Sequence, residues 1–325
     1  MITLSKIAKL AHVSVSTASK AFSMSNEVNA ETREMIFEIA KKYGCFKKFY
    51  NAKYPKLVFA VICPEFASRF YADALSAIQE YLKVYNCEIC VATTDFSVET
   101  EKTLLEYYTK YTNVDAIFNI AGQLSEFDGV EEIPVVNIFP LNNSRSEITV
   151  KFDLNNALQQ FLQYCKEKGI EDIGFIGEKK TDMKLNCFQQ KMEEVFGSFR
   201  KEYISTVEQR FEYGGFEAMR RLFATKSVPR VIVCAYDCMA IGAMRCICEH
   251  GLKVPEDIAI LGIDDTRESA FLPIPISSIN LNLGEACKQS IDALMNKLYD
   301  RPFSSEITIS AELKLRESCK IFKVL

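Results

Sequence analysis

Histidine is scarce in this chain, and its cysteines are poorly spaced for metal-dependent or nucleophilic chemistry. Histidine occurs only as His12 and His250, so a site that needs several imidazoles is nearly excluded. Cys87 and Cys90 have the spacing of a zinc or redox motif, but they fall in a strand-like run, where residues three apart point to opposite faces. Cys248 and His250 lie two apart near a helix end and do not face each other. We therefore expect no metal, no cofactor and no enzymatic activity.

Positive charge, in contrast, is concentrated at one end of the chain. Through residue 56 there are nine Lys and one Arg against four Glu, whereas the whole chain of 325 residues carries a net charge of −4. The N-terminal part is therefore basic and the remainder is acidic. A basic head on an acidic body is typical of nucleic-acid binding, because lysines displace the counterions of the phosphates. A solvated basic tail is the alternative.

Composition sets the general class of the protein. With 48% hydrophobic and 25% charged residues, the chain is an ordinary globular protein of roughly two domains. No apolar stretch approaches the ~20 residues of a membrane-spanning helix, and the N-terminus lacks the apolar run of a signal peptide. We therefore expect a cytoplasmic protein without membrane attachment, whose twelve cysteines are reduced thiols.

Residues 1–45 carry three short helical patterns. Thr3, Ser14 and Asn29 are suitable N-cap residues for the three helices, because each side chain can accept a hydrogen bond from a backbone N–H of the first turn. Apolar residues recur at helical spacing behind each cap. The expected inward stripes are Leu4, Ile7, Ala8 and Ala11, then Ala18, Ala21 and Phe22, then Ile36, Ile39, Ala40 and Tyr43, with Gly44 ending the third helix.

Two helices joined by a tight turn and braced by a third form a helix-turn-helix, whose second helix enters the major groove of DNA. The outward residues at the start of the second helix, Ser14, Val15 and Ser16, are small enough for close approach to base edges. Lys20, one turn later, can reach a guanine edge or a phosphate. A three-helix bundle used only for protein contacts is the alternative.

The runs TLSKIAKLAHVSVSTASKAF and NEVNAETREMIFEIAKKYG closely resemble the DNA-binding headpiece of LacI/GalR bacterial transcription regulators. The resemblance implies a double-stranded DNA operator as partner. His12 replaces a glycine that is usual at the turn. By position, the resemblance assigns base reading to Val15, Ser16 and Lys20, and phosphate contacts to Ser14, Thr17, Ser19 and Thr32.

Residues 46–56 form the expected linker or hinge between head and body. In the family this connector is a hinge helix that wedges a leucine into the minor groove, but here Pro55 would end a helix begun near Asn51. Tyr54 could replace the leucine, with Lys53 beside it. A flexible basic linker is the favoured interpretation, and it implies steep salt dependence and less DNA bending.

From residue 57 to 325, short apolar runs alternate with longer amphipathic stretches, which predicts βαβ units and parallel sheets. The pattern restarts at DIGFIGE, so we expect two doubly wound halves. The body resembles the type I periplasmic-binding-protein fold, most specifically in YDCMAIGAMRCICEHGLKVPEDIAILGIDDT. The expected architecture is a small all-α helix-turn-helix domain followed by this α/β body. Its subdomains are expected at about 57–152 with 281–309, and about 153–280 with 310–325.

The same resemblance implies a small-molecule effector between the two halves. It places Phe70 and Tyr71 at the cleft mouth, Lys184 where an arginine usually grips the effector, and Asp237 as a hydrogen-bond acceptor for it. Two further positions, Phe139 and Leu281, replace a frequent acid and a frequent glutamine, which indicates a less polar pocket or an atypical effector. Plain helix capping by Asp237 and core packing by Phe70 and Tyr71 remain alternatives.

These observations together predict a sequence-specific transcription regulator, and a repressor more readily than an activator. It would act as a homodimer, because two linked heads read two half-sites of an operator with high effective concentration. The alternative is a ligand-binding protein of the same fold whose head serves assembly rather than DNA recognition.

Overall fold

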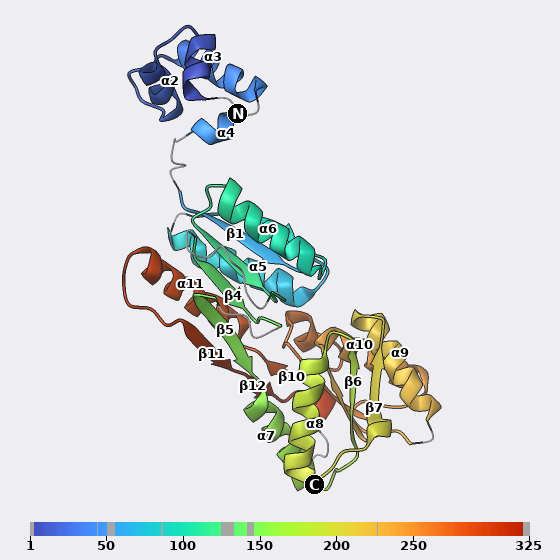
Figure 1. The fold of residues 1–325 in the computed structure, drawn as a ribbon. Coiled ribbons are helices and arrows are strands. Elements are labelled where there is room, and N and C mark those ends of the chain that lie inside the picture. The colour runs from blue at the N-terminus through green and yellow to red at the C-terminus, as the bar shows by residue number, and fades with distance from the viewer. Residues whose placement is uncertain are drawn as a thin grey trace. The chain divides into compact units, whose positions relative to one another are not determined.

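The computed structural model describes residues 3–43, 45–50, 56–85, 87–124, 133–141, 146–225 and 227–320. The chain divides into two compact units, Met1–Leu57 and Val58–Leu325 (Figure 1). The predicted hinge residues Lys53 and Tyr54 lie outside the described residues.

Three helices build the first unit, namely α1 (Leu4–Leu10), α2 (Val15–Phe22) and α3 (Ala30–Lys42). All three predicted caps are confirmed: Thr3, Ser14 and Asn29 accept hydrogen bonds from the backbone N–H groups of Lys6, Thr17 and Thr32. The third apolar stripe is shifted from the expected one. Phe37 is buried in the head core, whereas Tyr43 is 46% exposed.

A fourth, short helix α4 (Phe46–Phe49) packs onto this head. The Phe46 ring lies 4.9 Å from that of Phe37 and 4.8 Å from that of Tyr50, and the Phe49 ring lies 5.7 Å from that of Phe22. Phe46, Phe49 and Tyr50 therefore pack against the core of the head and do not belong to a free linker, because their large rings bury apolar surface there.

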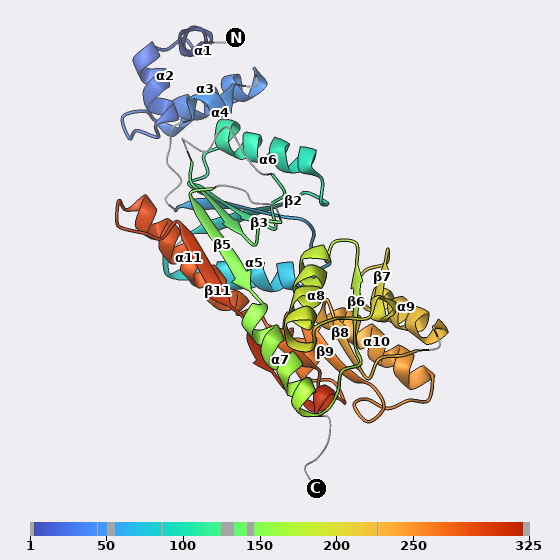
Figure 2. The ribbon, with the colours of Figure 1, turned by 60° about the horizontal axis from the view of Figure 1, so that its bottom comes forward.

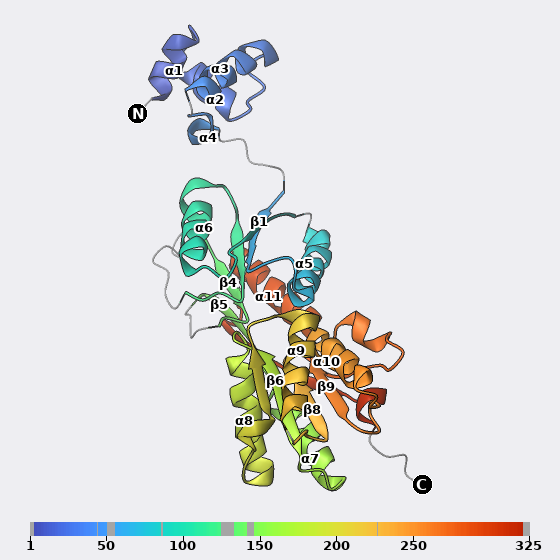
Figure 3. The ribbon, with the colours of Figure 1, turned by 90° about the vertical axis from the view of Figure 1, so that its right-hand side faces the viewer.

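The second unit contains two six-stranded sheets, each covered by helices on both faces. The first sheet is parallel throughout, with the strand order β11-β5-β4-β3-β1-β2. Helices α5 and α11 pack against each other on one face of it, and α6 covers the other face (Figure 3). Its elements are β1 (Val58–Cys63), α5 (Arg69–Leu82), η1 (Lys83–Tyr85), β2 (Glu88–Thr93), α6 (Val98–Tyr111), β3 (Ala116–Ile120), β4 (Val135–Ile138), β5 (Ile148–Asp153), α11 (Leu283–Leu298) and β11 (Glu306–Ser310).

The second sheet has the order β12-β10-β9-β8-β6-β7, in which β12 alone among these strands runs antiparallel to its neighbour. Helices α9 and α10 cross closely, since a side chain at Gly215 or Gly242 would meet backbone of the facing helix. The elements are α7 (Asn155–Glu167), β6 (Ile173–Glu178), α8 (Asp182–Phe196), η2 (Lys201–Tyr203), β7 (Ile204–Val207), α9 (Phe211–Ala224), β8 (Val231–Cys234), α10 (Asp237–Glu249), β9 (Ala259–Ile263), η3 (Arg267–Ala270), β10 (Ser277–Asn280), β12 (Glu312–Lys314) and η4 (Glu317–Cys319).

Three segments of chain connect the two sheets. One leads from β5 into α7 (Figure 2), one from β10 into α11, and one from β11 into β12 (Figure 1). They are hydrogen-bonded to one another: Ala311 N donates to Asp153 O, and Asn282 Nδ2 donates to Ser310 O, both at 2.9 Å. The predicted fold class, a helical head followed by two parallel-sheet α/β subdomains, is confirmed.

Candidate functional site

The exposed side of α2 is built from small residues. Ser14, Ser16 and Ser19 are exposed, and Val15 is 47% exposed, so no bulky side chain stands in front of the helix start. This side of the helix can therefore approach the base edges of a major groove. Two other predicted contact residues, Thr17 on α2 and Thr32 on α3, are half-buried.

Lys20 on α2 is already engaged within the head. Its ammonium forms an ion pair with the carboxylate of Glu27, in the loop between α2 and α3. The side chains are 43% and 69% exposed, so water screens the pair and its net stabilisation is small. A DNA phosphate or guanine edge can compete with Glu27 for this ammonium.

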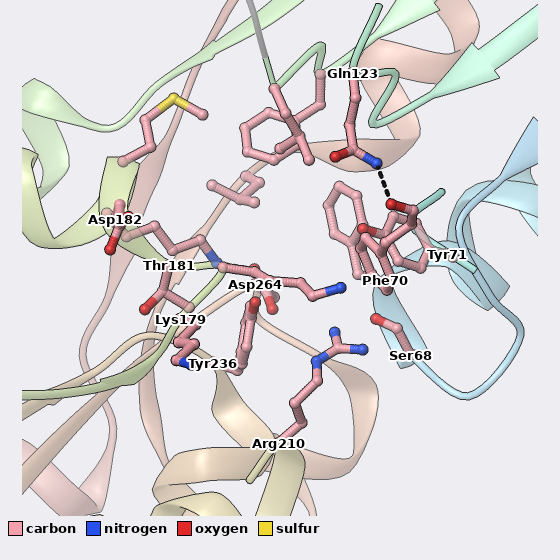
Figure 4. Close-up of a pocket in the computed structure, with 17 residues that line it drawn as sticks. Ser68, Phe70, Tyr71, Gln123, Lys179, Thr181, Asp182, Arg210, Tyr236 and Asp264 are labelled. Atoms are coloured by element: carbon pink, nitrogen blue, oxygen red, sulfur yellow. Dashed lines mark hydrogen bonds and ion pairs between the residues drawn. The ribbon is translucent and has the colours of Figure 1, made fainter. Parts of the chain in front are cut away.

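A cavity of about 320 Å³ lies between the two sheets of the body, lined by loops that follow the carboxyl ends of their strands (Figure 4). This is where parallel α/β sheets usually bind ligands. The structure brings Phe70, Tyr71 and Lys184 into its lining as expected. The full lining comprises Ser68, Phe70, Tyr71, Phe96, Gln123, Phe139, Leu141, Lys179, Lys180, Thr181, Asp182, Met183, Lys184, Arg210, Tyr236, Asp264 and Leu281.

Aromatic rings dominate the side of the cavity that belongs to the first sheet. The Phe70 ring makes edge contacts with Tyr71, at 5.5 Å between centroids, and with Phe139, at 6.1 Å. Phe96 follows β2 with φ 57°, a left-handed backbone that turns the chain sharply after the strand. Gln123 Nε2 donates to the Phe96 carbonyl at 2.9 Å and fixes that turn (Figure 4).

The backbone of Gln123 is itself hydrogen-bonded to a buried carboxylate, that of Glu101. Glu101, in the first turn of α6, is 2% exposed and accepts from Asn119 Nδ2 and Gln123 N, each at 2.9 Å. Such charge-assisted hydrogen bonds offset the loss of hydration of a buried carboxylate. Glu101 therefore acts as a positioning residue for the loop after β3.

The opposite side of the cavity carries the charged groups. Lys184 Nζ donates to Asp264 Oδ1 at 2.9 Å and to the carbonyl of Ala235 at 2.8 Å. Both side chains of this ion pair are below 10% exposed. The Lys184 ammonium is therefore already paired in the wall of the cavity, as a buried charge requires.

Arg210 links the two sides. Its Nη1 donates to Glu65, in the loop after β1, and its Nε donates at 3.3 Å to Glu178, at the end of β6. Glu178 is 1% exposed and also accepts from the Tyr236 hydroxyl at 3.0 Å. The Glu65–Arg210 pair therefore connects a loop of the first sheet to a loop of the second.

Two family models match the chain. The model described as bacterial regulatory proteins, lacI family, matches residues 3–45, and that of the periplasmic binding protein-like domain matches residues 162–319. The chain belongs to the LacI family.

Relatives of this LacI-family chain match it over nearly its whole length. The HTH-type transcriptional repressor PurR of Haemophilus influenzae (strain PittEE) is 24% identical, covering 98% of this chain and 99% of its own. Catabolite control protein A of Priestia megaterium is 25% identical, with the same coverage. These relatives are transcriptional regulators and not enzymes, in agreement with the prediction from histidine and cysteine spacing.

Solved structures share the fold. The lac repressor dimer bound to operator and the anti-inducer ONPF superimposes with a TM-score of 0.70 at 19% identity, covering 98% of both chains. The transcriptional regulator CelR in its cellobiose complex superimposes with a TM-score of 0.68 at 22% identity, covering 98% of this chain and 100% of its own.

Asp237 is not among the residues that line the cavity of this LacI-family body. It is fully buried at the start of α10, where its oxygens accept from Ser278 Oγ at 2.6 Å and from Thr266 N at 2.7 Å. A side chain at Gly262 would collide with this carboxylate. Asp237 thus fixes the loop after β9, and the expected direct contact with an effector has no geometric support.

Burial changes the protonation of Asp237. Loss of hydration, and next the neighbouring Asp264, raise its pKa to about 7, although the hydrogen bonds from Ser278 and Thr266 act in the opposite direction. Burial also raises the pKa of Asp264, which its pairing with Lys184 opposes.

The cavity contains functional candidates that the sequence did not suggest. Phe96, Gln123, Lys180 and Arg210 come from loops that follow four different strands. The alternation of strands and helices could have indicated strand ends in general, but it gives no signal for which loop residue turns inward. Phe139 and Leu281, the two expected apolar replacements, do line the cavity.

Eleven of the twelve cysteines are buried or half-buried, and Cys248 is exposed. Cys87 Sγ and Cys90 Sγ donate to different carbonyls, those of Tyr85 and Phe59, and burial raises the pKa of Cys87 to about 11. The ring of His250 stacks on Phe223 at 4.1 Å rather than facing Cys248. Within the described ranges, no group of three or more His, Cys, Asp or Glu side chains is arranged to hold a metal, and no helix is long and apolar enough to span a membrane.

Proposed function

We propose that this chain is a transcription repressor that binds a pseudo-palindromic operator as a homodimer, with an affinity set by a small molecule in the cavity between its sheets. DNA binding is supported above all by the start of α2, where the exposed residues are small. This helix belongs to the head that the lacI family model matches. Val15, Ser16 and Lys20 are the proposed base-reading residues, and Ser14, Thr17, Ser19 and Thr32 the proposed phosphate contacts.

Two heads are proposed because one makes too few contacts for operator affinity, whereas two linked heads gain effective concentration. The related lac repressor was solved as a dimer on its operator. Such a protein has to reach the chromosome, so we place it in the cytoplasm.

Effector control is proposed to act through the angle between the two sheets. The cavity draws residues from both sides, so a ligand that contacts both stabilises one arrangement. In a dimer, that arrangement sets the distance between the heads. The ligand can change operator affinity only by the difference of its affinities for the two arrangements.

Selection of bound fragments from the host genome by the full-length protein tests this proposal. We expect enriched fragments to share an inverted repeat, and a duplex carrying it to bind far more tightly than a scrambled duplex at two salt concentrations. Weak retardation that ignores sequence would instead support a ligand-binding protein whose head serves assembly.

A further inference from the structure

The two sides of the cavity differ in chemistry. Every charged residue in its lining follows a strand of the second sheet, whereas the first sheet contributes mainly aromatic rings, with Ser68, Gln123 and the hydroxyl of Tyr71 as its polar groups. Gln123 already donates to the Phe96 carbonyl. A ligand rich in hydroxyl groups would therefore leave many of them without partners against the aromatic side, which costs binding energy.

Lys180 is the cation that this arrangement leaves available. Its Nζ lies 3.2 Å from the centroid of the Phe96 ring, and the described residues provide no carboxylate within ion-pair distance. By contrast, Lys184 is paired with Asp264, and Lys179 with Glu208. Burial, and next the charge of Arg210, lower the pKa of Lys180, so an added anion would stabilise the ammonium.

The guanidinium of Arg210 also lies over the Phe96 ring. Its guanidinium carbon lies 4.9 Å from the Phe96 centroid, and Nη2 has no hydrogen bond to a described residue although Nη1 and Nε are bonded to carboxylates. Lys180 Nζ and Arg210 Nη2 can thus both donate to one anionic group near Phe96. Charge-assisted hydrogen bonds of this kind are about twice as strong as neutral ones.

We propose that the effector is an aromatic ring compound with one anionic group, a phosphate or a carboxylate. Its ring packs against Phe70 and Phe139, and its anion pairs with Lys180 and Arg210 beside Phe96. Each side of the cavity then binds one part of the same molecule, so the ligand holds the two sides together. This inference rests on the proposed function, because it names the chemistry of the effector site.

Binding of simple probes to the full-length protein tests the proposal, by calorimetry and by thermal shift. Phenyl phosphate and benzoate carry both features, whereas benzyl alcohol and benzamide have the ring without the charge. Glucose 6-phosphate has the charge on a hydroxyl-rich ring, and glucose has neither feature. We expect at least one aromatic anion to bind more tightly than all four other compounds, and the phosphate and carboxylate arms identify the preferred anion.

Two variants locate the anion. Lys180→Met keeps the length of the side chain without its charge and is expected to weaken binding of the aromatic anion by about tenfold or more. Lys253→Met removes an exposed charge of the same subdomain outside the cavity and should leave binding unchanged. Thermal unfolding of both variants without ligand checks that each is folded.

Equal binding of neutral and anionic rings, preference for glucose 6-phosphate, or no binding of either aromatic anion would each overturn the inference. So would an unchanged affinity in Lys180→Met. Operator binding is measured on the same preparations. A protein that binds its operator but none of these probes contradicts the inference about the effector and leaves the proposed function as a DNA-binding repressor intact.

Discussion

Lys20 places a positive charge on the side of α2 that we propose to face DNA. We expect Lys20→Ala to weaken operator binding by roughly 1 to 3 kcal/mol, because a contact to guanine or phosphate is lost. Titrations on the operator and on a scrambled duplex distinguish these two contacts, since loss of a phosphate contact weakens both. Lys42→Ala, an exposed charge in the last turn of α3, serves as the control. Unchanged operator affinity in Lys20→Ala would remove this residue from the interface.

Glu27 opposes that contact in the free head. It neutralises the ammonium of Lys20 and adds a negative charge near the proposed DNA-facing helix. We therefore expect Glu27→Gln to tighten operator binding several-fold, with the larger gain at low salt. Weaker binding would mean that Glu27 positions the lysine for DNA instead of competing with it.

Asp237 makes stability depend on pH. Its pKa rises from the usual value near 4 to about 7 on folding, so the folded state binds a proton more tightly than the unfolded chain. The corresponding stabilisation is complete below about pH 4 and is lost as the pH rises through about 7. We expect the melting temperature of the wild type to fall between about pH 5 and about pH 8 by more than that of Asp237→Asn. Parallel pH profiles of the two proteins would argue against a raised pKa.

At the scale of elements, α4 extends the head beyond the three expected helices. The Phe46 ring contacts Phe22, Phe37 and Tyr50, and truncation of a half-buried aromatic removes several such contacts. We expect Phe46→Ala to lower the stability of the head by roughly 2 kcal/mol. Hydrogen exchange of the amides in α1 to α3, measured in the full chain, checks this. Tyr43→Ala is the matched control, because that ring is exposed. Equal exchange in the two variants would show that α4 contributes little.

Local signals explain which elements could be predicted. The caps Ser14 and Asn29 act within four residues of themselves, and the strand at DIGFIGE is one apolar run, so sequence alone locates them. In α3 the buried stripe includes Phe37 and not the expected Tyr43, and this difference has a non-local cause. The rings of α4 cover Phe37, and the helical period of α3 carries no information about that contact.

The candidate site was predictable only in part for the same reason. Phe70 and Lys184 lie in the first turns of α5 and α8. Each of these helices begins just after a strand ends, so its first turn lies near the cavity. Phe96 depends on a left-handed turn, and Arg210 on the packing of a loop from another sheet. The burial of the Asp237 side chain depends on Thr266 and Ser278, which donate hydrogen bonds to it although they lie 29 and 41 positions further along the chain.

At the scale of the whole body, the Glu65–Arg210 pair holds the loops of the two sheets together without ligand. Both side chains are about 20% exposed, so the pair is only partly screened by water. We expect Glu65→Gln to raise hydrogen exchange several-fold in the loops that follow β1 and β7. Glu80→Gln, an exposed residue of α5, should leave both loops unchanged. Identical exchange in all three proteins would show that other contacts hold these two loops in place.

The three connections between the sheets have a consequence for signalling. Asp153, Asn282 and Ala311 lie at neighbouring crossings that hydrogen bonds tie together, so any sliding of one half past the other would stretch a covalent segment or break those bonds. Rotation about a line through the crossings is the motion that strains them least. We therefore expect a compound that fills the cavity to change the angle between the two halves rather than to slide one past the other.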